Sequence, residues 1–335
     1  IRDCLLSRGL GDVYKRQVVG YTHNNKIGAI VAIEPKSGEI LSLISSPSYN
    51  PAQLSGRNRS KNFKKLISNK ENYVVIVDDL STGSLDKLPH HLPKDNWRFV
   101  KANVNEYRDI AEIMLGKKFD YVFHYAALVG VQRTQEYPVK VLKDIEGFKH
   151  VLNLCKSTGV KRVFFSSSSE VYGEPVELPQ HEETTPLNSK VPYAVVKNIG
   201  EAFLRSYQQE FGLDYTIFRF FNTYGPKQSD DFVMSKFLYK ALKGEDITIY
   251  GDGSQTRTFC FCDDNVDACL KTLYNNKIVN DVINIGGEDE IRIIDLAQKI
   301  IALTNSSSKI VHLPPLKAVS YTHLRAHETR GNLVC

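Results

Sequence analysis

The sequence predicts an α/β protein with a parallel, doubly wound sheet over most of its 335 residues. From residue 73 onward, short β-branched and aromatic runs alternate with longer spans of helical periodicity, the pattern of consecutive β-α-β units. Two of the short runs end in polar residues, Asp78 and the serines that begin at Ser166. The fractions of 42% hydrophobic and 24% charged residues are those of a soluble globular chain.

The expected elements follow the chain in order. Strands are expected over residues 73–77, 101–104, 121–126, 161–165, 214–219 and 282–285. Helices are expected over residues 107–115, 139–156, 193–211, 232–242, 265–274 and 294–303. Before residue 71 the pattern of hydrophobic and polar residues differs. Two strand-like runs, 28–35 and 38–45, flank a Pro-Lys-Ser-Gly turn and predict a hairpin, and residues 59–69 form a short basic helical pattern.

One stretch concentrates the chemistry of the chain. A serine run containing Ser168 follows the strand at 161–165 and leads to Glu170, and Tyr193 and Lys197 open the next helix. Their i, i+4 spacing puts the phenol and the ammonium on one helix face. An ammonium beside a phenol favours the phenolate, so Tyr193 is expected to act as a base near neutral pH, with Ser168 orienting a substrate hydroxyl. The pattern alone is also compatible with an ordinary amphipathic helix.

More motifs occur in a fixed order around this stretch. They are Val75 to Gly83 (VIVDDLSTG), His124 to Ala127 (HYAA), Ser167 to Gly173 (SSSEVYG), Arg219 to Pro226 (RFFNTYGP), Gly251 to Gly253 (GDG), and Arg257 to Phe259 (RTF) followed by Asp263 and Asp264. Together with the Tyr-x-x-x-Lys pair they resemble the extended short-chain dehydrogenase/reductase family, the NAD-dependent nucleotide-sugar epimerases, dehydratases and decarboxylases. The resemblance covers roughly residues 71–317.

The resemblance implies NAD as the cofactor. Contacts to it are implied for Asp78, Asn103, Tyr125, Ala126, Ala127 and Lys197. Asp78 ends a strand, where a carboxylate can accept both hydroxyls of the adenosine ribose, and an acid there favours NAD over NADP because a 2′-phosphate would be repelled. Tyr193 would take the proton from a sugar hydroxyl as hydride leaves the same carbon, while Lys197 holds the nicotinamide ribose.

A nucleotide sugar is the implied substrate, a UDP-hexose or a UDP-uronate. The resemblance implies that Asn222 and Arg257 bind the nucleotide diphosphate, and Lys236 is a further candidate for this role. Arginine suits this task because its planar fork binds two oxygens at once. A structural salt bridge to Asp263 or Asp264 is the alternative for Arg257.

Glu170 bears on which reaction within the family the sequence most resembles. Dehydratases and decarboxylases carry an acid at this position, able to move a proton once a 4-keto intermediate has formed, whereas plain 4-epimerases usually do not. Ser169 stands where dehydratases usually have an aspartate, so the pair resembles the UDP-glucuronate decarboxylases. The region of Ala127, Leu128 and Arg133 is more similar to certain UDP-hexose 4-epimerases. The branch stays open between these two, and a solvated loop acid is the plain alternative for Glu170.

The family's first strand and Gly-x-x-Gly-x-x-Gly turn are missing from the expected place. Residues 46–59 contain one glycine and two prolines, and no strand pattern leads into them. We therefore expect a Rossmann-type fold that lacks its first strand and glycine-rich loop, and weak or no NAD binding, because backbone N–H groups of that loop hold the pyrophosphate. The expected division is a truncated NAD-binding domain over 71–228 and a region 229–317 that is mainly substrate lobe, with some Rossmann elements at about 265–287.

The remaining segments resemble other sequences. Residues 18–70 resemble the start of a class B penicillin-binding protein transpeptidase domain, and residues 1–17 and 318–335 resemble translated sequencing adapter. An inactive chimeric product is thus one alternative, and a cell-wall transpeptidase relative is another. A transpeptidase needs a nucleophilic serine in a Ser-x-x-Lys motif. Ser84 to Lys87 and Ser306 to Lys309 match this motif, but both lie within the region that resembles the short-chain dehydrogenase/reductase family.

Composition limits the partners. Acidic residues outnumber basic ones within 71–317, so the net charge of +5 arises from the flanking segments, and nucleic acid is not an expected partner. No apolar run is long enough to span a membrane. The six cysteines show no Cys-x-x-Cys pair, and no metal site or disulfide framework is expected; Cys260 and Cys262 are expected to alternate along a strand. A cytoplasmic location and, for intact family members, a homodimer are expected.

Overall fold

A computed structural model describes residues 17–20, 28–33, 40–46, 72–89, 97–174, 176–274 and 278–314, the first three ranges as backbone alone. Most of the two adapter-like ends, the basic helical pattern at 59–69 and the stretch 47–59 lie outside the described residues.

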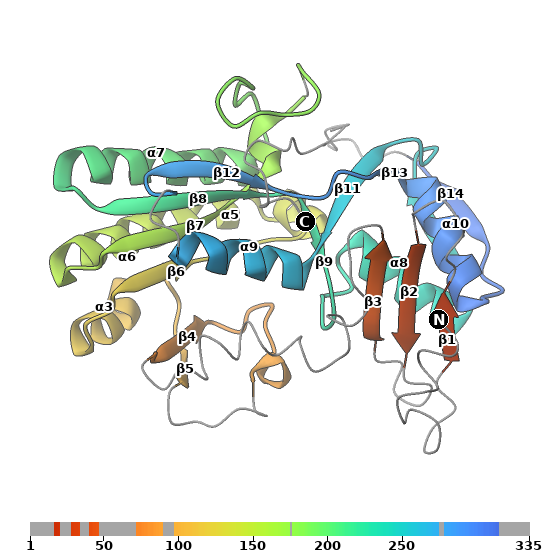
Figure 1. The fold of residues 1–335 in the computed structure, drawn as a ribbon, viewed down its shortest axis with the longest axis horizontal. Helices are drawn as coiled ribbons and strands as arrows, with labels where there is room; N and C mark the ends of the chain where they lie inside the picture. The colour runs from red at the N-terminus through yellow and green to blue at the C-terminus, as the bar shows by residue number, and fades with distance from the viewer. Residues whose placement is uncertain are drawn as a thin grey trace.

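Six parallel strands form the larger part of the molecule (Figure 1). They are β4 (Val74–Asp78), β5 (Trp97–Lys101), β6 (Tyr121–His124), β7 (Arg162–Ser168), β8 (Asp214–Phe220) and β12 (Asp281–Ile285). They pair in two pieces, β4 with β5 and the four-stranded order β12-β8-β7-β6. In the described part of the chain no strand joins β4 to β6, which is where the sequence predicts a missing strand.

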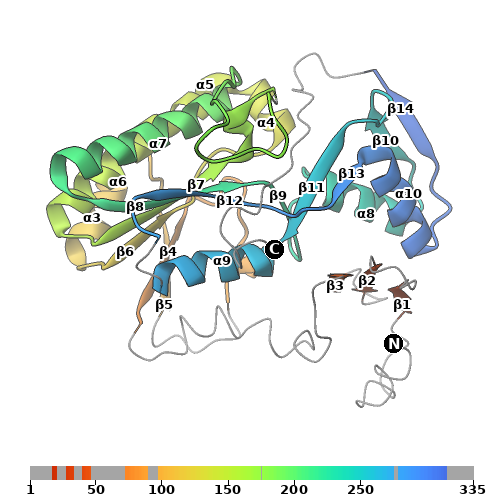
Figure 2. The ribbon, with the colours of Figure 1, turned by 45° about the horizontal axis from the view of Figure 1, so that its top comes forward.

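Helices cover both faces of these strands, which confirms the doubly wound α/β prediction (Figure 2). On one face lie α3 (Tyr107–Gly116), α4 (Val131–Glu136), α5 (Pro138–Leu142), α6 (Asp144–Thr158) and α7 (Pro192–Phe211), and α9 (Cys262–Tyr274) lies on the other. A short 3-10 helix, η2 (Leu85–Lys87), follows β4, and another, η4 (Ser169–Tyr172), continues directly from β7. The carboxyl end of β7 is therefore followed at once by a short helical turn, and α7 begins only at Pro192.

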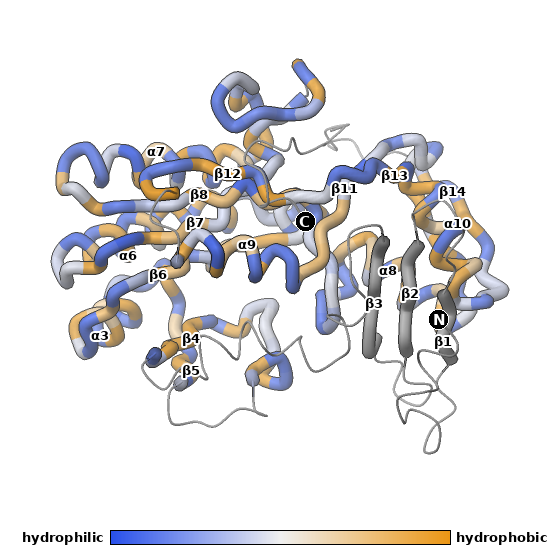
Figure 3. Tube along the Cα trace, viewed as in Figure 1, coloured by the Kyte–Doolittle hydropathy of each residue, from blue (hydrophilic) through white to orange (hydrophobic). Residues whose placement is uncertain are grey.

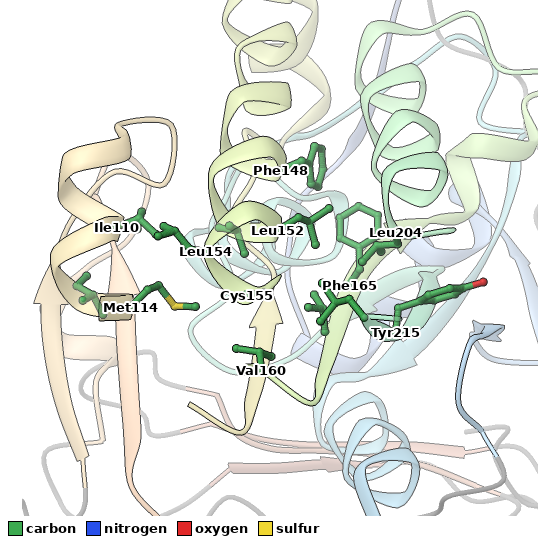
Figure 4. Packing of buried hydrophobic residues seen from close by; sticks show 14 of the residues in the cluster. Ile110, Met114, Phe148, Leu152, Leu154, Cys155, Val160, Phe165, Leu204 and Tyr215 are labelled. Atoms are coloured by element: carbon green, nitrogen blue, oxygen red, sulfur yellow. The ribbon is translucent and has the colours of Figure 1, made fainter. Parts of the chain in front are cut away.

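The main core lies between the strands and the layer formed by α3, α6 and α7 (Figure 4). Ile110 and Met114 of α3, Leu152 of α6 and Phe165 of β7 belong to one buried cluster, and Figure 3 shows the hydrophobic colouring along β7 and β8. A second cluster packs α9 on the opposite face and contains Phe164, which is fully buried. Central parallel strands are apolar on both faces because helices cover both of them.

A smaller lobe follows β8. Its elements are β9 (Asn222–Tyr224), α8 (Val233–Lys243), β10 (Ile247–Tyr250), β11 (Thr256–Phe261), β13 (Glu290–Arg292), α10 (Ile293–Thr304) and β14 (Ile310–Leu313). β10 pairs in parallel with β14, and β11 lies between β13 and β9. Helices α8 and α10 share an apolar cluster of their own with β10. In sequence α9 and β12 interrupt this lobe, but they pack with the larger sheet.

The N-terminal strands form a separate antiparallel sheet of β1 (Gln17–Gly20), β2 (Gly28–Ile33) and β3 (Ile40–Ser46). β2 and β3 pair in the register Ile30 to Ile44, in the region where the sequence predicts a hairpin. None of the three strands pairs with β4 or β6, so this sheet does not complete the interrupted one.

Three local predictions were wrong. The strand expected over 101–104 is β5, four residues earlier, because Asn103 forms a turn in which its side chain accepts the N–H of Asn105 (3.0 Å). The single helix expected over 139–156 is two helices, since α5 ends at Leu142 and α6 begins at Asp144. Cys262 starts α9 rather than continuing the strand that contains Cys260.

A buried ion pair joins the strands to α7. Arg219 of β8 donates to both carboxylate oxygens of Glu201, from Nε (2.9 Å) and Nη2 (2.8 Å), and both side chains are almost fully buried. Burial by itself raises the pKa of Glu201, but hydrogen bonds and charge from Arg219, with Ser167 and Arg205, outweigh it and lower that pKa. Glu201 therefore stays ionised inside the protein.

Replacing Glu201 by glutamine should lower the free energy of unfolding by about 3–5 kcal/mol, because it leaves the Arg219 charge buried without a counter-ion. Urea unfolding at pH 7 measures this. Arg205→Gln is the matched control: Arg205 also binds Glu201 (3.0 Å), but 42% of its side chain is exposed, so its loss should cost at most about 1 kcal/mol. Equal costs for the two variants would contradict the assignment.

Candidate active site

The carboxyl end of β7 supplies the first group of polar side chains. Ser168 is the last residue of the strand and the N-cap of η4, and its Oγ accepts the Glu170 N–H (3.2 Å). The Ser168 hydroxyl also hydrogen-bonds with the hydroxyl of Tyr193. The fold thus brings Ser168 and Tyr193 together, although they are 25 positions apart in the sequence (193 minus 168).

Helix α7 begins beside this strand end. Pro192 occupies its first turn, where its fixed φ suits a helix start, and Tyr193 follows directly. Lys197, 2% exposed, donates from Nζ to the Ser166 carbonyl (2.6 Å) and to Ser166 Oγ (3.3 Å). Its Nζ lies 5.6 Å from the centre of the Tyr193 ring. The helix therefore presents both side chains to the end of β7.

The pKa values of Tyr193 and Lys197 differ from those expected from the sequence. Burial raises the pKa of Tyr193 to about 12, and the Glu170 and Asp144 carboxylates add to the rise while the Ser168 hydrogen bond opposes it. Burial lowers the pKa of Lys197 to about 8, opposed by Asp144. The expectation that the ammonium lowers the phenol pKa is therefore wrong for this structure, because desolvation of the phenolate dominates.

Glu170 interacts electrostatically with Arg257 across the two lobes. Burial raises the pKa of the Glu170 carboxyl and the charge of Arg257 opposes the rise; burial likewise lowers the pKa of Arg257, opposed by Glu170. Arg257 lies on β11 and donates from Nη1 to the Thr256 carbonyl (2.7 Å). The start of η4 and the start of β11 thus bring one carboxyl group and one guanidinium group near the Ser168–Tyr193 pair, since Glu170 also acts on the Tyr193 pKa.

The residues predicted to contact a cofactor lie on both sides of the sheet interruption. Asp78 is the exposed last residue of β4, and its Oδ1 accepts the Leu80 N–H (2.7 Å). A Cβ at Gly83 would lie only 2.7 Å from that oxygen, so the loop packs closely on the carboxylate. Asn103 lies just after β5, and its N–H is bound by the Asp109 carboxylate (3.0 Å).

Tyr125, Ala126 and Ala127 follow β6 without helix or strand structure. The Tyr125 hydroxyl donates to Cys269 Sγ of α9 (3.1 Å). The structure therefore brings the segment after β6 next to α9, while Asp78 and Asn103 belong to the β4–β5 piece.

The predicted substrate residues belong to the smaller lobe. Asn222 opens β9, and its side-chain amide donates to the Thr258 carbonyl of β11 (3.1 Å). Arg257 is the residue before Thr258, so Asn222 and Arg257 lie on adjacent strands. Lys236 lies in α8, and no contact of its side chain brings it to Arg257 or Tyr193 among the described residues.

Three groups near the site were not predicted. His124 is buried between Phe148 and Phe165, with ring centres 5.0 and 6.2 Å away, and burial together with the Lys197 charge lowers its pKa to about 3. Asp144 influences both Tyr193 and Lys197. Glu201 lies four residues after Lys197, and that helical spacing was the one sequence signal that could have identified it.

The alternative nucleophiles have structural roles. Ser84 caps η2, its Oγ accepting the Asp86 N–H (3.4 Å). Ser306 follows α10 and donates to the Ala241 carbonyl (2.6 Å). Neither serine starts a Ser-x-x-Lys turn on an α-helix. Within the described ranges, no helix is both long and apolar enough to cross a membrane, and no cluster of three or more His, Cys, Asp or Glu side chains is suited to a metal ion.

Lys197→Met should stabilise the fold at neutral pH. Because the folded pKa of about 8 lies below the ordinary 10.5, the unfolded chain binds the proton more tightly, and stability rises with pH between about 8 and 10.5. This difference between the folded and unfolded pKa of Lys197 corresponds to about 3 kcal/mol of unfolding free energy. The hydrogen bonds lost in the variant offset about 1 kcal/mol of it.

Urea unfolding should therefore give a gain of about 2 kcal/mol at pH 7 that shrinks as the pH approaches 10. Lys161→Met, at an exposed lysine paired with Asp120 (2.7 Å), should show no such gain. A destabilised Lys197→Met at pH 7 would contradict the buried-charge argument.

The sequence matches known proteins over much of its length. The profile of the NAD dependent epimerase/dehydratase family matches residues 60–286. A UDP-N-acetyl-alpha-D-glucosaminuronate decarboxylase from Bacillus cytotoxicus is 36% identical over 249 residues, 72% of this chain and 75% of that protein. UDP-glucuronic acid decarboxylase 3 from Arabidopsis thaliana is 32% identical over 253 residues, 73% and 71% of the two chains.

Solved structures show the same fold. The UDP-glucose 4-epimerase of Thermotoga maritima, solved with UDP-glucose, superposes with a TM-score of 0.73 at 30% identity, over 81% of this chain and 86% of that one. With the profile match over most of the described residues, and relatives above 30% identity across more than two thirds of their length, the conclusion is direct: this chain belongs to the NAD-dependent epimerase/dehydratase family.

Proposed function

We propose that the chain carries the catalytic residues of an NAD-dependent UDP-uronate decarboxylase. The observation that supports this most is the position of Glu170, an acid with a raised pKa beside both Tyr193 and Arg257. An acid there is useful when a carbon has to be protonated, which decarboxylation requires. Several relatives are UDP-glucuronic acid decarboxylases, which agrees with this choice.

Tyr193 is the proposed base for the substrate. Its hydroxyl is hydrogen-bonded to Ser168, which would align the C4 hydroxyl of the sugar so that its proton passes to the tyrosine. With the pKa of Tyr193 at about 12, the phenolate is scarce in the free protein. When the ligands are bound, a positive charge near Tyr193 therefore has to stabilise the phenolate. NAD, when bound, supplies the hydride acceptor for the C4 carbon.

Glu170 and Arg257 are proposed to handle the second half of the reaction. Once C4 is a ketone, the bond between C5 and the carboxyl carbon breaks, its electron pair moves toward the C4 oxygen, and carbon dioxide leaves. C5 then needs a proton, and Glu170, whose pKa is raised by burial, is proposed to deliver it. The C4 ketone would then take back the hydride from the reduced cofactor and a proton from Tyr193, which gives the UDP-pentose. Arg257 and Asn222 are proposed to bind the anionic and polar parts of the substrate.

The described residues fit only part of NAD. Lys197 and Tyr193 are available for the nicotinamide side and Asp78 for the adenosine ribose, but the sheet is interrupted between β4 and β6, where a phosphate-binding turn would begin. Part of the proposal is therefore that this chain binds NAD weakly. We also propose that 71–228 with about 265–287 forms the cofactor side, and the rest of 229–317 the substrate side.

Epimerisation at C4 is the second candidate. It is supported by the likeness to UDP-glucose 4-epimerase and by an uncharacterized UDP-glucose epimerase of Bacillus subtilis at 29% identity. Carbon dioxide release separates the two reactions. The homodimer and the cytoplasmic location implied by the resemblance belong to the same proposal.

With UDP-glucuronate and NAD at high concentration, the chain should release carbon dioxide and form a UDP-pentose. Glu170→Gln should slow carbon dioxide release by about 10²–10⁴-fold, because the amide cannot donate the proton. Glu174→Gln, at an exposed acid four residues away, is the matched control and should leave the rate unchanged. Conversion of UDP-glucuronate to UDP-galacturonate without carbon dioxide release would instead favour the epimerase.

NAD retention is a separate prediction. The chain purified without added cofactor should carry little or no NAD, measured by absorbance and by release on acid treatment, because the diphosphate would lack a cradle of backbone N–H groups. Stoichiometric NAD after purification would contradict this and would indicate that residues outside the described ranges complete the site.

A further inference from the structure

Asp144 accepts hydrogen bonds from two segments that follow different strands. Its Oδ2 accepts the backbone N–H of Leu128, in the segment after β6 (2.7 Å), and its Oδ1 accepts from the side-chain amide of Asn105, in the turn after β5 (3.1 Å). Asp144 itself is the half-buried first residue of α6. One carboxylate therefore connects the start of a helix to the segments that follow two strands of separate sheet pieces.

A third contact fixes the orientation of the Asn105 amide. Its Oδ1 accepts the N–H of Gly147, three residues further along α6 (3.1 Å), so its nitrogen faces Asp144. A Cβ at Gly147 would lie only 2.7 Å from that oxygen, so α6 packs closely on Asn105. Both groups bound by the Asp144 carboxylate are thus donors, and an asparagine in its place could accept from only one of them.

The two connected segments carry the predicted cofactor contacts. Asn103 lies two residues before Asn105, and its side chain accepts the Asn105 N–H (3.0 Å). Residues 125–127 directly precede Leu128 and belong to no helix or strand. A segment of this kind has no hydrogen-bonded ladder along its backbone, so a side chain that binds its N–H group contributes much to its position.

The Asp144 charge also acts on Tyr193 and Lys197. It opposes the burial that lowers the pKa of the Lys197 ammonium to about 8, and it helps to raise the pKa of Tyr193. His124 of β6 is neutral here, because burial and the Lys197 charge lower its pKa to about 3. Glu170 acts on Tyr193, whereas the Asp144 charge acts on both members of the pair.

We propose that Asp144 is a positioning residue of the active site: its carboxylate fixes residues 125–127 relative to Asn103, and its negative charge acts on Lys197. Asp144 exerts this effect through other groups and is not itself a catalytic residue. The inference rests on the proposed function only where it assigns Asn103 and residues 125–127 to the cofactor.

Nuclear magnetic resonance of the whole chain without ligand tests this role. In Asp144→Ala both hydrogen bonds are lost, so the Leu128 amide should exchange about tenfold or more faster, and the methyl signals of Ala126 and Ala127 should shift. The Lys197 ammonium should titrate below its pKa of about 8, because the charge that opposes its desolvation is gone.

Two further variants supply the controls. Glu146→Ala removes another acid from the first turn of α6, one paired with Lys149 (3.0 Å), and should change none of these signals. The double variant Asn105→Asp with Asp144→Asn exchanges the amide and the carboxylate. Its new amide can donate toward position 105 while its oxygen still accepts the Leu128 N–H, so the slow Leu128 exchange and both methyl signals should return.

Rapid Leu128 exchange and a lowered Lys197 titration in Asp144→Ala, with the slow exchange restored in the double variant, support the proposal. It is overturned by an unchanged Leu128 exchange, by equal changes in Glu146→Ala, or by a folded double variant that does not restore the exchange. An unchanged Lys197 titration also overturns it, because a merely structural residue would leave that titration where it is.

If Asp144→Ala does not fold, Asp144→Asn takes its place, since that variant has to give up one of the two hydrogen bonds as well as the charge. All these measurements are made without NAD or substrate. A chain that releases no carbon dioxide from UDP-glucuronate therefore counts against the proposed function and leaves the result for Asp144 unaffected.

Discussion

The buried ion pair between Arg219 and Glu201 is the contact on which the site depends. Arg219 also donates to the Tyr172 hydroxyl (2.9 Å), which in turn donates to Asn284 (2.7 Å), so one guanidinium connects β8, α7, η4 and β12. Ser167 donates to the same Glu201 carboxylate (2.6 Å). Since Ser167 precedes Ser168 and Glu201 lies one helical turn after Lys197, this network fixes the strand end relative to the helix that carries Tyr193. A buried pair of this kind adds little net stability compared with apolar residues, but it specifies one arrangement strongly.

Much of the fold was predictable because alternating helical and extended patterns are local properties. The span of α7 and the strand before it followed from periodicity, and the family motifs placed Tyr193 and Lys197 at the start of one helix. The position of β5 was missed because the turn at Asn103 is decided by a side-chain hydrogen bond, which an apolar run does not encode. Among the described residues no strand joins the two sheet pieces, an interruption that the sequence also indicated, whereas no motif identified Asp144, which binds the segments that follow β5 and β6.

The electrostatics of the site were less predictable. Proximity of Lys197 suggested a lowered phenol pKa for Tyr193, but depth of burial is a tertiary property and it dominates here. The same burial keeps His124 neutral, and Lys197 Nζ lies 5.6 Å from the centre of the Tyr193 ring. Residue types and spacing thus identified the residues of the candidate site, and the packing around these residues sets their protonation states.

The start of α7 at Pro192 has a consequence for charge at the site. The aligned peptide dipoles of a 20-residue helix place about half a positive charge at its N-terminus, which is where Tyr193 lies. The first turn contains no acidic residue that would neutralise it. A developing phenolate, or an anionic group of a ligand, is therefore stabilised there by the backbone itself, by about 0.3–1 kcal/mol at an exposed helix end and up to about 2 kcal/mol when partly buried. Because this contribution comes from peptide groups, no side-chain substitution that preserves the helix removes it.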